Sequence, residues 1–166
     1  MTLQEALNAH QQLRLYSCFQ MAPELSLKLS GILSLNSYPF QSQPWDGKGY
    51  EPYRENCKIG KLELQFLEIN YKYPYEGMFD RFREELNKGK FPVVSLMPEL
   101  NRPSFWHGYV VVQPIDDNDF VIASKIGSVD SGQCESLVDK LSNKLKTKGK
   151  VDALFWQVVE NNPNNE

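Results

Sequence analysis

Four short apolar runs, rich in β-branched and aromatic residues, constrain the fold of this chain more than any other feature. They are FPVVSLM (residues 91–97), FWHGYVVVQP (105–114), FVIAS (120–124) and VDALFWQVV (151–159). Runs of this length and composition are typical of β-strands. The segment IDDND (115–119) joins the second run to the third, and its Asp and Asn residues suit a hairpin turn. The second half of the chain is therefore expected to form an antiparallel sheet.

The first half of the chain carries helical patterns. Residues 3 to about 9 have the pattern of a short helix or a fraying arm, and the apolar spacing between Ala22 and Ile32 predicts a longer helix. That longer helix begins either at Cys18, with Pro23 distorting its first turns, or at Pro23 itself. Helices followed by strands predict the α+β class.

Two further helices are expected later in the chain. One runs through MFDRFREELNKG (78–89) and stops at Gly89. The other is expected over Gln133–Thr147, with a solvated face made of lysines. The lysines in question are Lys140, Lys144, Lys146, Lys148 and Lys150. Residues 34–75 are expected to be mostly loop, although KLELQFLEINY (61–71) within them fits a strand or a helix.

Length and composition indicate one domain. The chain has 166 residues, of which 41% are hydrophobic, and this is enough material for one core. We expect a single domain over residues 1–160 and a disordered polar tail over residues 161–166. The formal net charge is −3 and most lysines are scattered, so no nucleic-acid partner is expected. The oligomeric state is left open.

The N-terminal segment and the cysteines bear on the cellular compartment. MTLQEALNAHQQLRLY contains an acidic residue and no long apolar run, unlike a secretory signal peptide, and no stretch is long and apolar enough for a membrane span. We therefore expect a cytoplasmic protein without a membrane partner, although an effector exported by another route would have the same features. Cys18, Cys57 and Cys134 form no CxxC pair, so no disulfide framework, metal site or other cofactor is predicted.

Cys18, His107 and Gln12 are the candidate reactive residues. Cys18 lies six residues after Gln12 at the start of a predicted helix, and His107 lies in a predicted strand. A thiol attacks as the thiolate, so a helix N-terminus and an imidazolium would have to lower its pKa, while the Gln amide would donate to an oxyanion. Taken singly, each residue has a simpler interpretation: a small buried apolar residue, a half-buried histidine and a surface glutamine.

From about Gln12 to Ser124 the chain resembles the papain-like cysteine peptidase superfamily, in particular its small bacterial branch related to bacteriocin-leader-processing peptidases. ELNKGKFPVVSLM (85–97) and HGYVVV (107–112) resemble the segments that lead to the family's histidine and that bear it. Phe19 stands where the family usually has Gly, and Gln20 where it often has Pro. The residues that match the nucleophile region are Gln12, Cys18, Ala22, Glu24, Leu27 and Gly31.

This resemblance implies an α+β fold in which a helical half, carrying the nucleophile helix, packs on an antiparallel sheet. It also implies that Cys18 is the nucleophile, that His107 is the general base and acid, and that Gln12 contributes to the oxyanion hole together with the Cys18 backbone amide. The implied substrate is a peptide or protein, or a glutamine-type amide. Hydrolysis, deamidation and transfer to an amine share the acyl-enzyme, and the sequence does not separate them.

The third member of the catalytic group departs from the family pattern. In the family, an Asp or Asn about sixteen or seventeen residues after the His orients the ring, and the same count here reaches Ala123 and Ser124. Ser124 would orient the ring of His107 through its hydroxyl, without supplying a charge. The acidic residues of the turn at 115–119 lie on the order of 30 Å away along the strand, whereas Asp130 stays an alternative.

Two other interpretations remain open at this stage. Phe19 and Ser124 favour a papain-like domain without catalysis that binds a peptide or protein partner. An unrelated α+β protein with Cys18 in its core is the third alternative.

Overall fold

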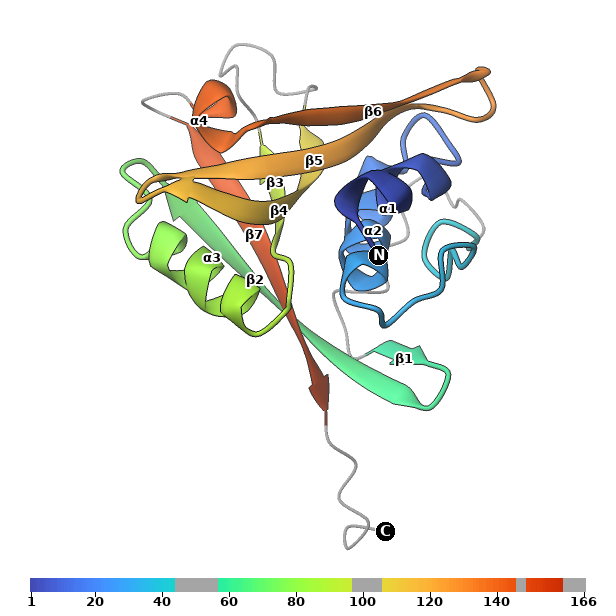
Figure 1. Ribbon diagram of the computed structural model, residues 1–166, viewed down its shortest axis with the longest axis horizontal. Coiled ribbons are helices and arrows are strands. Elements are labelled where there is room, and N and C mark those ends of the chain that lie inside the picture. The colour runs from blue at the N-terminus through green and yellow to red at the C-terminus, as the bar shows by residue number, and fades with distance from the viewer. Residues whose placement is uncertain (44–56, 97–105, 146–148, 160–166) are drawn as a thin grey trace, which may run out of the picture.

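One antiparallel sheet organises the structure, which is a computed structural model describing residues 1–43, 57–96, 106–145 and 149–159 (Figure 1). Within these residues the fold is α+β, with four helices and a seven-stranded sheet in the order β1-β2-β7-β3-β4-β5-β6. All the pairings between neighbouring strands are antiparallel. In chain order the elements are α1 (Leu3–Ala9), α2 (Cys18–Leu29), β1 (Cys57–Ile59), β2 (Leu62–Lys72), α3 (Met78–Asn87), β3 (Val93–Leu96), β4 (His107–Asp116), β5 (Asp119–Ser128), β6 (Gln133–Lys140), α4 (Leu141–Lys144) and β7 (Lys150–Val159).

Helices cover both faces of the sheet. Figure 1 shows α1 and α2 on one side and α3 on the other. Alternate residues of β4 point to the two sides, because side chains along a strand alternate between the faces of a sheet. Val110 packs in the apolar cluster that contains α2, whereas Tyr109 and Val111 pack in the cluster that contains Phe82 of α3. The sheet therefore separates two apolar cores.

The nucleophile-bearing helix predicted from the sequence is α2. It begins at Cys18 and contains Pro23, so the first of the two predicted starting points is correct. Its apolar residues face the sheet, where Leu25 is fully buried. A hydrogen bond of 2.9 Å from Trp156 Nε1 to Ser26 Oγ fixes the middle of α2 against β7. The helix is thus held to the sheet by both apolar packing and a buried polar contact.

The predicted strands of the second half are confirmed as β3, β4, β5 and β7. The hairpin turn between β4 and β5 closes with Asp116 opposite Asp119, as the IDDND segment predicted. KLELQFLEINY forms β2, which pairs with β7 from Glu63 to Lys72. The long segment expected to be mostly loop therefore contributes two strands of the sheet, β1 and β2.

The helix predicted over Gln133–Thr147 is wrong. Residues Gln133–Lys140 form the edge strand β6, which pairs with β5 along its whole length, and helix is limited to Leu141–Lys144. The misleading pattern was the spacing of Leu137, Leu141 and Leu145. A spacing of four residues brings side chains to one face of a helix and equally to one face of a strand, so it does not separate the two.

The predicted lysine face is wrong for the same reason. Lys140 ends β6, Lys144 lies in α4 and Lys150 begins β7, so these lysines belong to three different elements. Lys146 and Lys148 lie outside the described residues, as do the expected tail at 161–166 and most of the segment between β3 and β4. Charged residues are common on edge strands, where they discourage pairing with other chains.

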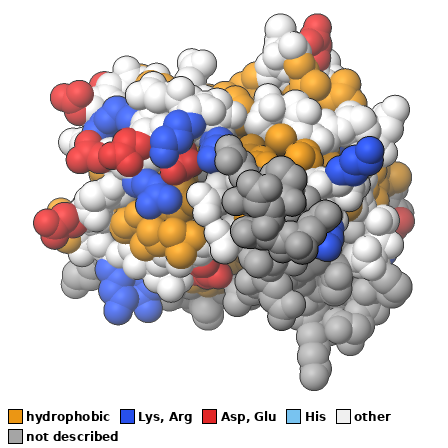
Figure 2. Space-filling model, turned by 90° about the horizontal axis from the view of Figure 1, so that it is seen from below, with side chains coloured by type: hydrophobic (Ala, Val, Ile, Leu, Met, Phe, Trp, Pro, Cys, Tyr) orange, Lys and Arg blue, Asp and Glu red, His pale blue; other side chains and the backbone are white. Residues whose placement is uncertain are grey.

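The surface around α3 carries charges of both signs. Its ion pairs include Arg81 with Glu85 at 3.1 Å and Arg83 with Asp80 at 2.6 Å. Figure 2 shows acidic and basic side chains intermixed on this half of the molecule. Among the described residues, none of the helices is both long and apolar enough to span a bilayer.

Candidate functional site

The site predicted from the sequence lies where the start of α2 meets the start of β4. A Cβ atom placed on Gly108 would lie 2.8 Å from the Cys18 carbonyl oxygen and 3.1 Å from Ala22 Cβ. Real Cβ atoms do not approach a backbone atom this closely, so only glycine allows the observed distance between helix and strand. Gly108 follows His107 directly, and the structure therefore brings the Cys18 backbone next to the residue that follows His107.

His107 and Tyr109 share one face of β4. Their rings meet edge to face with centroids 5.0 Å apart, whereas Gly108 faces α2 on the other side of the strand. Burial raises the pKa of Tyr109 to about 12, and the charges of Asp139 and of Cys18 add to the effect. The Cys18 thiol is thus close enough to the Tyr109 hydroxyl for their charges to interact.

Ser124 contacts the His107 ring. Ser124 lies opposite Leu137 on β5, is fully buried, and places Oγ 2.7 Å from Nε2 of His107. The same Oγ lies 2.7 Å from the Gly108 carbonyl oxygen and 3.2 Å from that of Lys125. Ser124 is one of the two residues, with Ala123, that the family's spacing from His107 reaches.

These contacts favour the neutral form of His107 with its proton on Nε2. A serine hydroxyl has one proton, and carbonyl oxygens only accept, so the hydroxyl donates to Gly108 or Lys125. Its oxygen must then accept a hydrogen bond from Nε2–H of His107. In the neutral ring Nδ1 is consequently bare and available as a base. The Lys125 carbonyl oxygen also lies within hydrogen-bond reach of the ring and favours its protonated form.

The electrostatics differ from the sequence expectation. The thiol was expected to have a lowered pKa, but burial raises the pKa of Cys18, and the N–H groups of Gly108, Cys18 and Phe19 offset this only in part. Burial also lowers the pKa of His107, and the charge of Lys144 acts in the same direction, against the Lys125 carbonyl. Burial penalises the charged form of both groups, so the resting state holds a neutral thiol and a neutral imidazole.

The structure also shows no direct polar contact between the thiol of Cys18 and the ring of His107. Within the described residues, Cys18 Sγ makes no hydrogen bond to the ring of His107. Catalytic hydrogen bonds are often long or misaligned until substrate binds. The geometry therefore gives an orienting contact for His107 and a close approach of the Cys18 backbone to Gly108, but no thiol–imidazole hydrogen bond among the described residues.

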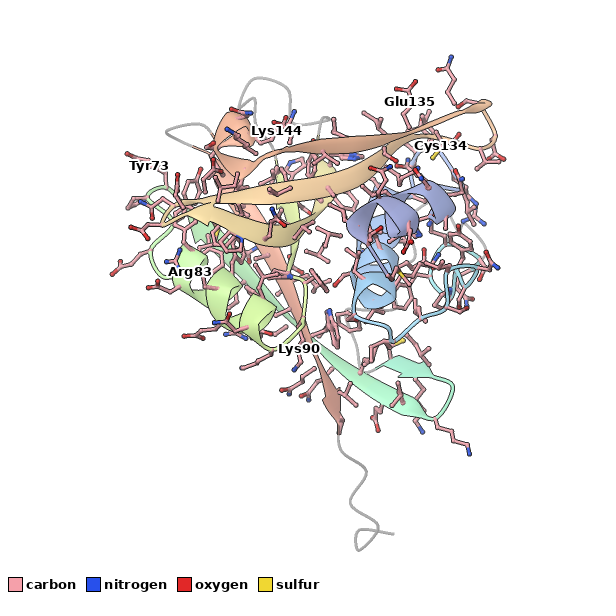
Figure 3. All side chains as sticks on the ribbon, in the orientation of Figure 1. Tyr73, Arg83, Lys90, Cys134, Glu135 and Lys144 are labelled. Carbon is pink, nitrogen blue, oxygen red and sulfur yellow. The ribbon has the colours of Figure 1, made fainter. Side chains whose placement is uncertain are left out.

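Gln12 is not placed to act on an oxyanion in this structure. Its side-chain Nε2 donates to the carbonyl oxygens of Arg14 at 2.9 Å and Leu15 at 3.0 Å, which uses both amide protons. Its backbone N–H points at Cys134 Sγ at 3.4 Å, and Cys134 lies on β6 (Figure 3). The role predicted for Gln12 would require the bonds to Arg14 and Leu15 to break.

Two further residues that support the site were not identified from the sequence. Gln41 is fully buried, and its Oε1 accepts from Leu13 N at 2.7 Å and lies 2.8 Å from Ser17 Oγ. Gly108 was the other, although a glycine inside a strand is a known signal of close backbone approach. Gln41 gave no such signal because it lies in a segment without hydrophobic periodicity.

Asp130, the alternative partner for His107, lies in the exposed turn between β5 and β6. A separate open hollow of about 480 Å³ is lined by Tyr73, Phe79, Arg83 and their neighbours. Tyr73 and Arg83 lie on the side of the sheet away from α2 (Figure 3), and the hollow contains none of the predicted site residues. In the described ranges, no three or more His, Cys, Asp or Glu side chains are grouped so as to hold a metal ion.

Comparison of the chain with protein-family models, with curated proteins and with solved structures finds no match.

Proposed function

We propose that this protein is a thiol-dependent hydrolase or acyl transferase of papain-like architecture, with Cys18 as nucleophile and His107 as general base and acid. The observation that carries the proposal is the hydrogen bond between His107 Nε2 and Ser124, on a strand whose next residue, Gly108, lies against the Cys18 backbone at the start of α2. A ring oriented by a third group, next to a thiol at a helix N-terminus, is the arrangement that thiol-based acyl transfer needs.

The reaction would begin from neutral partners. As a carbonyl group approaches, Nδ1 of His107 takes the proton of Cys18 and the sulfur attacks the carbonyl carbon. The backbone N–H of Cys18 donates to the developing oxyanion, and Gln12 joins it once its bonds to Arg14 and Leu15 break. The imidazolium then returns its proton to the leaving amine, and water, deprotonated by the same ring, releases the acyl group.

Ser124 gives the ring its orientation but no negative charge. An acidic partner would stabilise the imidazolium formed during this cycle, whereas a hydroxyl does so only by accepting a hydrogen bond. This agrees with a resting pair that is neutral, because Ser124 supplies no negative charge to the ring. The substrate class we propose is a peptide or a glutamine-type amide, supported by the resemblance in residues 12–124.

A second candidate function is binding of a peptide or protein partner without catalysis. Three observations favour it: the raised pKa of the Cys18 thiol, the absence of a Cys18–His107 hydrogen bond in the described residues, and the use of both Gln12 amide protons by local carbonyl groups. The two functions differ in whether an acyl group is transferred to Cys18 with help from His107.

Acylation by p-nitrophenyl acetate tests the proposal directly. Cys18 is expected to form a thioester as p-nitrophenolate leaves, with the thiol proton passing to His107. His107→Ala is expected to slow this acylation about tenfold, because the base is lost while the leaving group needs no protonation. The measurement is the burst of p-nitrophenolate, together with mass spectrometry of the peptide that contains Cys18.

Cys57→Ser is the matched control, since Cys57 is a half-buried free thiol on β1, away from His107. It is expected to leave the burst unchanged. Two results would contradict the proposed catalytic function and support the binding function. One is acetylation of Cys57 or Cys134 at the rate of Cys18, and the other is an unchanged acylation rate in His107→Ala.

The tautomer of His107 gives a separate prediction. The chain has two histidines, so long-range proton–nitrogen NMR spectra resolve both rings. We expect His107 to be in the Nε2–H form in the native protein and a mixture of tautomers in Ser124→Ala, because the acceptor at Nε2 is gone. His10 is the internal control: its Nε2 donates to the Met21 carbonyl at 2.9 Å in both proteins. A single unchanged tautomer of His107 in Ser124→Ala would mean that Ser124 does not orient the ring.

A further inference from the structure

Ile126 is a large apolar side chain that stays open to solvent on the sheet. It lies on β5, an inner strand between β4 and β6, and is 47% exposed. Its neighbour Lys125 points to the other face, where its Nζ donates to the Leu7 carbonyl oxygen of α1 at 2.8 Å. Because side chains alternate along a strand, Ile126 faces away from α1 and α2.

The strand register places Ile126 opposite His107. Val110 of β4 pairs with Ala123 of β5. Three residues back along β4 and three residues on along β5, the same antiparallel register pairs His107 with Ile126. The contact of 2.7 Å between His107 Nε2 and Ser124 Oγ agrees, because Ser124 lies on the same face two residues before Ile126. Side chains that lie directly opposite on one face have Cβ atoms about 5 Å apart, so His107 and Ile126 are neighbours.

The row of side chains continues to an acidic residue on the edge strand. Glu135 of β6 pairs with Ile126 and is exposed, and Figure 3 shows its side chain on the side of β6 away from α1. Within the described residues, Glu135 makes no hydrogen bond or ion pair. The row therefore runs from the imidazole of His107 through an apolar side chain to an unpaired carboxylate, over about 10 Å.

The imidazole determines which part of a substrate meets this row. In the proposed reaction His107 returns its proton to the leaving amine, so the leaving segment has to lie against the ring, whereas the acyl segment stays bonded to Cys18. Alternate side chains of an extended peptide lie about 7 Å apart on one side. A first leaving residue in contact with Ile126 therefore brings the third leaving residue within reach of Glu135.

We propose that Ile126 and Glu135 select the leaving segment of the substrate: Ile126 contacts an apolar side chain on the first residue after the cleaved amide, and Glu135 pairs with a basic side chain on the third. This inference rests on the proposed function of Cys18 and His107. It defines the substrate more closely, as a peptide in which an apolar residue follows the cleaved amide and a Lys or Arg lies two residues further on.

The test uses the acyl-enzyme that p-nitrophenyl acetate forms at Cys18, because the surface that holds a leaving amine also holds an attacking one. The amine nitrogen attacks the thioester carbonyl, the C–N bond forms as the C–S bond breaks, and the amine proton passes through His107 to the sulfur. The measurement is the ratio of acetylated peptide to acetate. This ratio does not depend on how fast Cys18 was acylated.

Three peptide amides serve as acceptors, with the sequences Leu-Gly-Arg, Gly-Gly-Arg and Leu-Gly-Glu. Leu-Gly-Arg is expected to accept the acetyl group about tenfold better than Gly-Gly-Arg, because the leucine side chain covers the exposed surface of Ile126. It is expected to exceed Leu-Gly-Glu about threefold at low salt, which is the size of effect typical of an exposed ion pair.

Variants of the two residues separate the apolar preference from the charge preference. Ile126→Ala is expected to reduce the preference for Leu over Gly to about twofold. Ile126→Thr keeps the β-branched shape that suits a strand and is expected to do the same if Ile126→Ala fails to fold. Glu135→Gln is expected to abolish the preference for Arg over Glu. The matched controls are Leu67→Ala on β2, where Leu67 is 50% exposed, and Glu84→Gln on α3, and both preferences are expected to persist in them.

Three outcomes would overturn the inference: equal transfer to all three peptides in the native protein, an unchanged preference for Leu in both Ile126 variants, or the same loss in Leu67→Ala. A preference for Arg that survives in Glu135→Gln would overturn the role of Glu135. Failure of the proposed function appears before any peptide is added, as acylation that does not occur at Cys18 or that ignores His107, so the two failures are distinguishable.

Discussion

Gly108→Ala is expected to lower the free energy of unfolding by about 3 kcal/mol and to abolish the burst of acylation at Cys18. The added Cβ would lie 2.8 Å from the Cys18 carbonyl oxygen, a backbone atom that no side-chain rotation moves away. Gly108 does not have a positive φ, so an alanine fits its backbone conformation and the effect is purely one of space. Either α2 or β4 must shift, and the first turn of α2 carries the thiol.

The helix has little freedom to give way. Trp156 on β7 donates to Ser26 at 2.9 Å, and Phe40 N donates to the buried Glu24 carboxylate at 3.0 Å. These contacts hold the middle of α2 in place, whereas the new Cβ of Gly108→Ala clashes with its first turn. Displacement of that turn would separate Cys18 from His107 while the rest of the core stays packed. Reactivity is therefore expected to be lost even where the protein still folds.

The measurements are urea denaturation and the p-nitrophenolate burst. Ala22→Gly in the same chain is the diagnostic second change, because it removes the methyl group 3.1 Å from the new Cβ but leaves the Cys18 carbonyl in place. The double variant is expected to stay as unreactive as Gly108→Ala. A Gly108→Ala protein as stable as the native one would contradict the close contact, since Gly→Ala by itself gains about 0.4–1 kcal/mol where the residue fits.

The sheet was predictable from the sequence because its strands carry the signal that single sequences show best. Runs of Val, Ile and aromatic residues between turn-forming residues identify β3, β4, β5 and β7. Ser124 followed from the family resemblance: its count of sixteen or seventeen residues after His107 reaches Ala123 and Ser124, and the hairpin of β4 and β5 brings Ser124 beside the ring. The two register shifts between β4 and β5 did not spoil this count.

The remaining errors share a physical cause: the spacing of apolar residues along the sequence does not determine how deeply a side chain is buried or which way it points. Leu137, Leu141 and Leu145 suit both a helix and a strand, and only pairing with β5 decides for β6. The direction of the pKa shift of Cys18 depends on how deeply the thiol is buried, whereas its position at a helix N-terminus suggested the opposite sign. Both the assignment of β6 and the direction of the Cys18 pKa shift depend on contacts that form only when the sheet is assembled.

A buried polar network beneath α2 gives the second large prediction. Glu24 and Lys28 of α2 and His10 are all fully buried. Lys28 Nζ donates to His10 Nδ1 at 2.9 Å and to the Leu35 carbonyl at 2.8 Å, and it lies 3.6 Å from the centre of the Tyr38 ring. Glu24 accepts two backbone N–H groups through Oε2, while its buried Oε1 has no hydrogen-bond partner among the described residues.

The carboxyl of Glu24 makes stability depend on pH. Burial raises its pKa from 4.5 to about 7, against the hydrogen bonds of Phe40 and Gln41 and the charge of Lys28. Between these two values the folded protein keeps a proton that the unfolded chain has lost, so this group's contribution is fully present below pH 4.5 and is lost as pH rises through 7. The loss amounts to roughly 3 kcal/mol, because each unit of pKa shift corresponds to about 1.4 kcal/mol.

His10 acts with the opposite sign. Burial and the charges of Lys28 and Lys125 lower its pKa from 6.5 to about 3, so the folded protein binds fewer protons than the unfolded chain and its contribution grows as pH rises from 3 to 6.5. Burial lowers the pKa of Lys28 to about 8, with the charge of Glu24 opposing it. The native protein therefore mixes several titrations, and only a difference between two proteins isolates the one at Glu24.

Glu24→Gln provides that difference, because glutamine keeps the shape and the acceptor oxygen but does not titrate. Relative to the native protein, the variant is expected to gain roughly 3 kcal/mol in free energy of unfolding between pH 4.5 and pH 8. His10 is common to both proteins and cancels. Urea denaturation of both proteins at intervals across this range measures the gain, which is expected to grow steadily above pH 4.5 and to level off near pH 7. A difference that is constant across the range would mean that Glu24 is ionised in the folded protein throughout. The hydrogen bonds from Phe40 N and Gln41 N would then outweigh the cost of burying the charge.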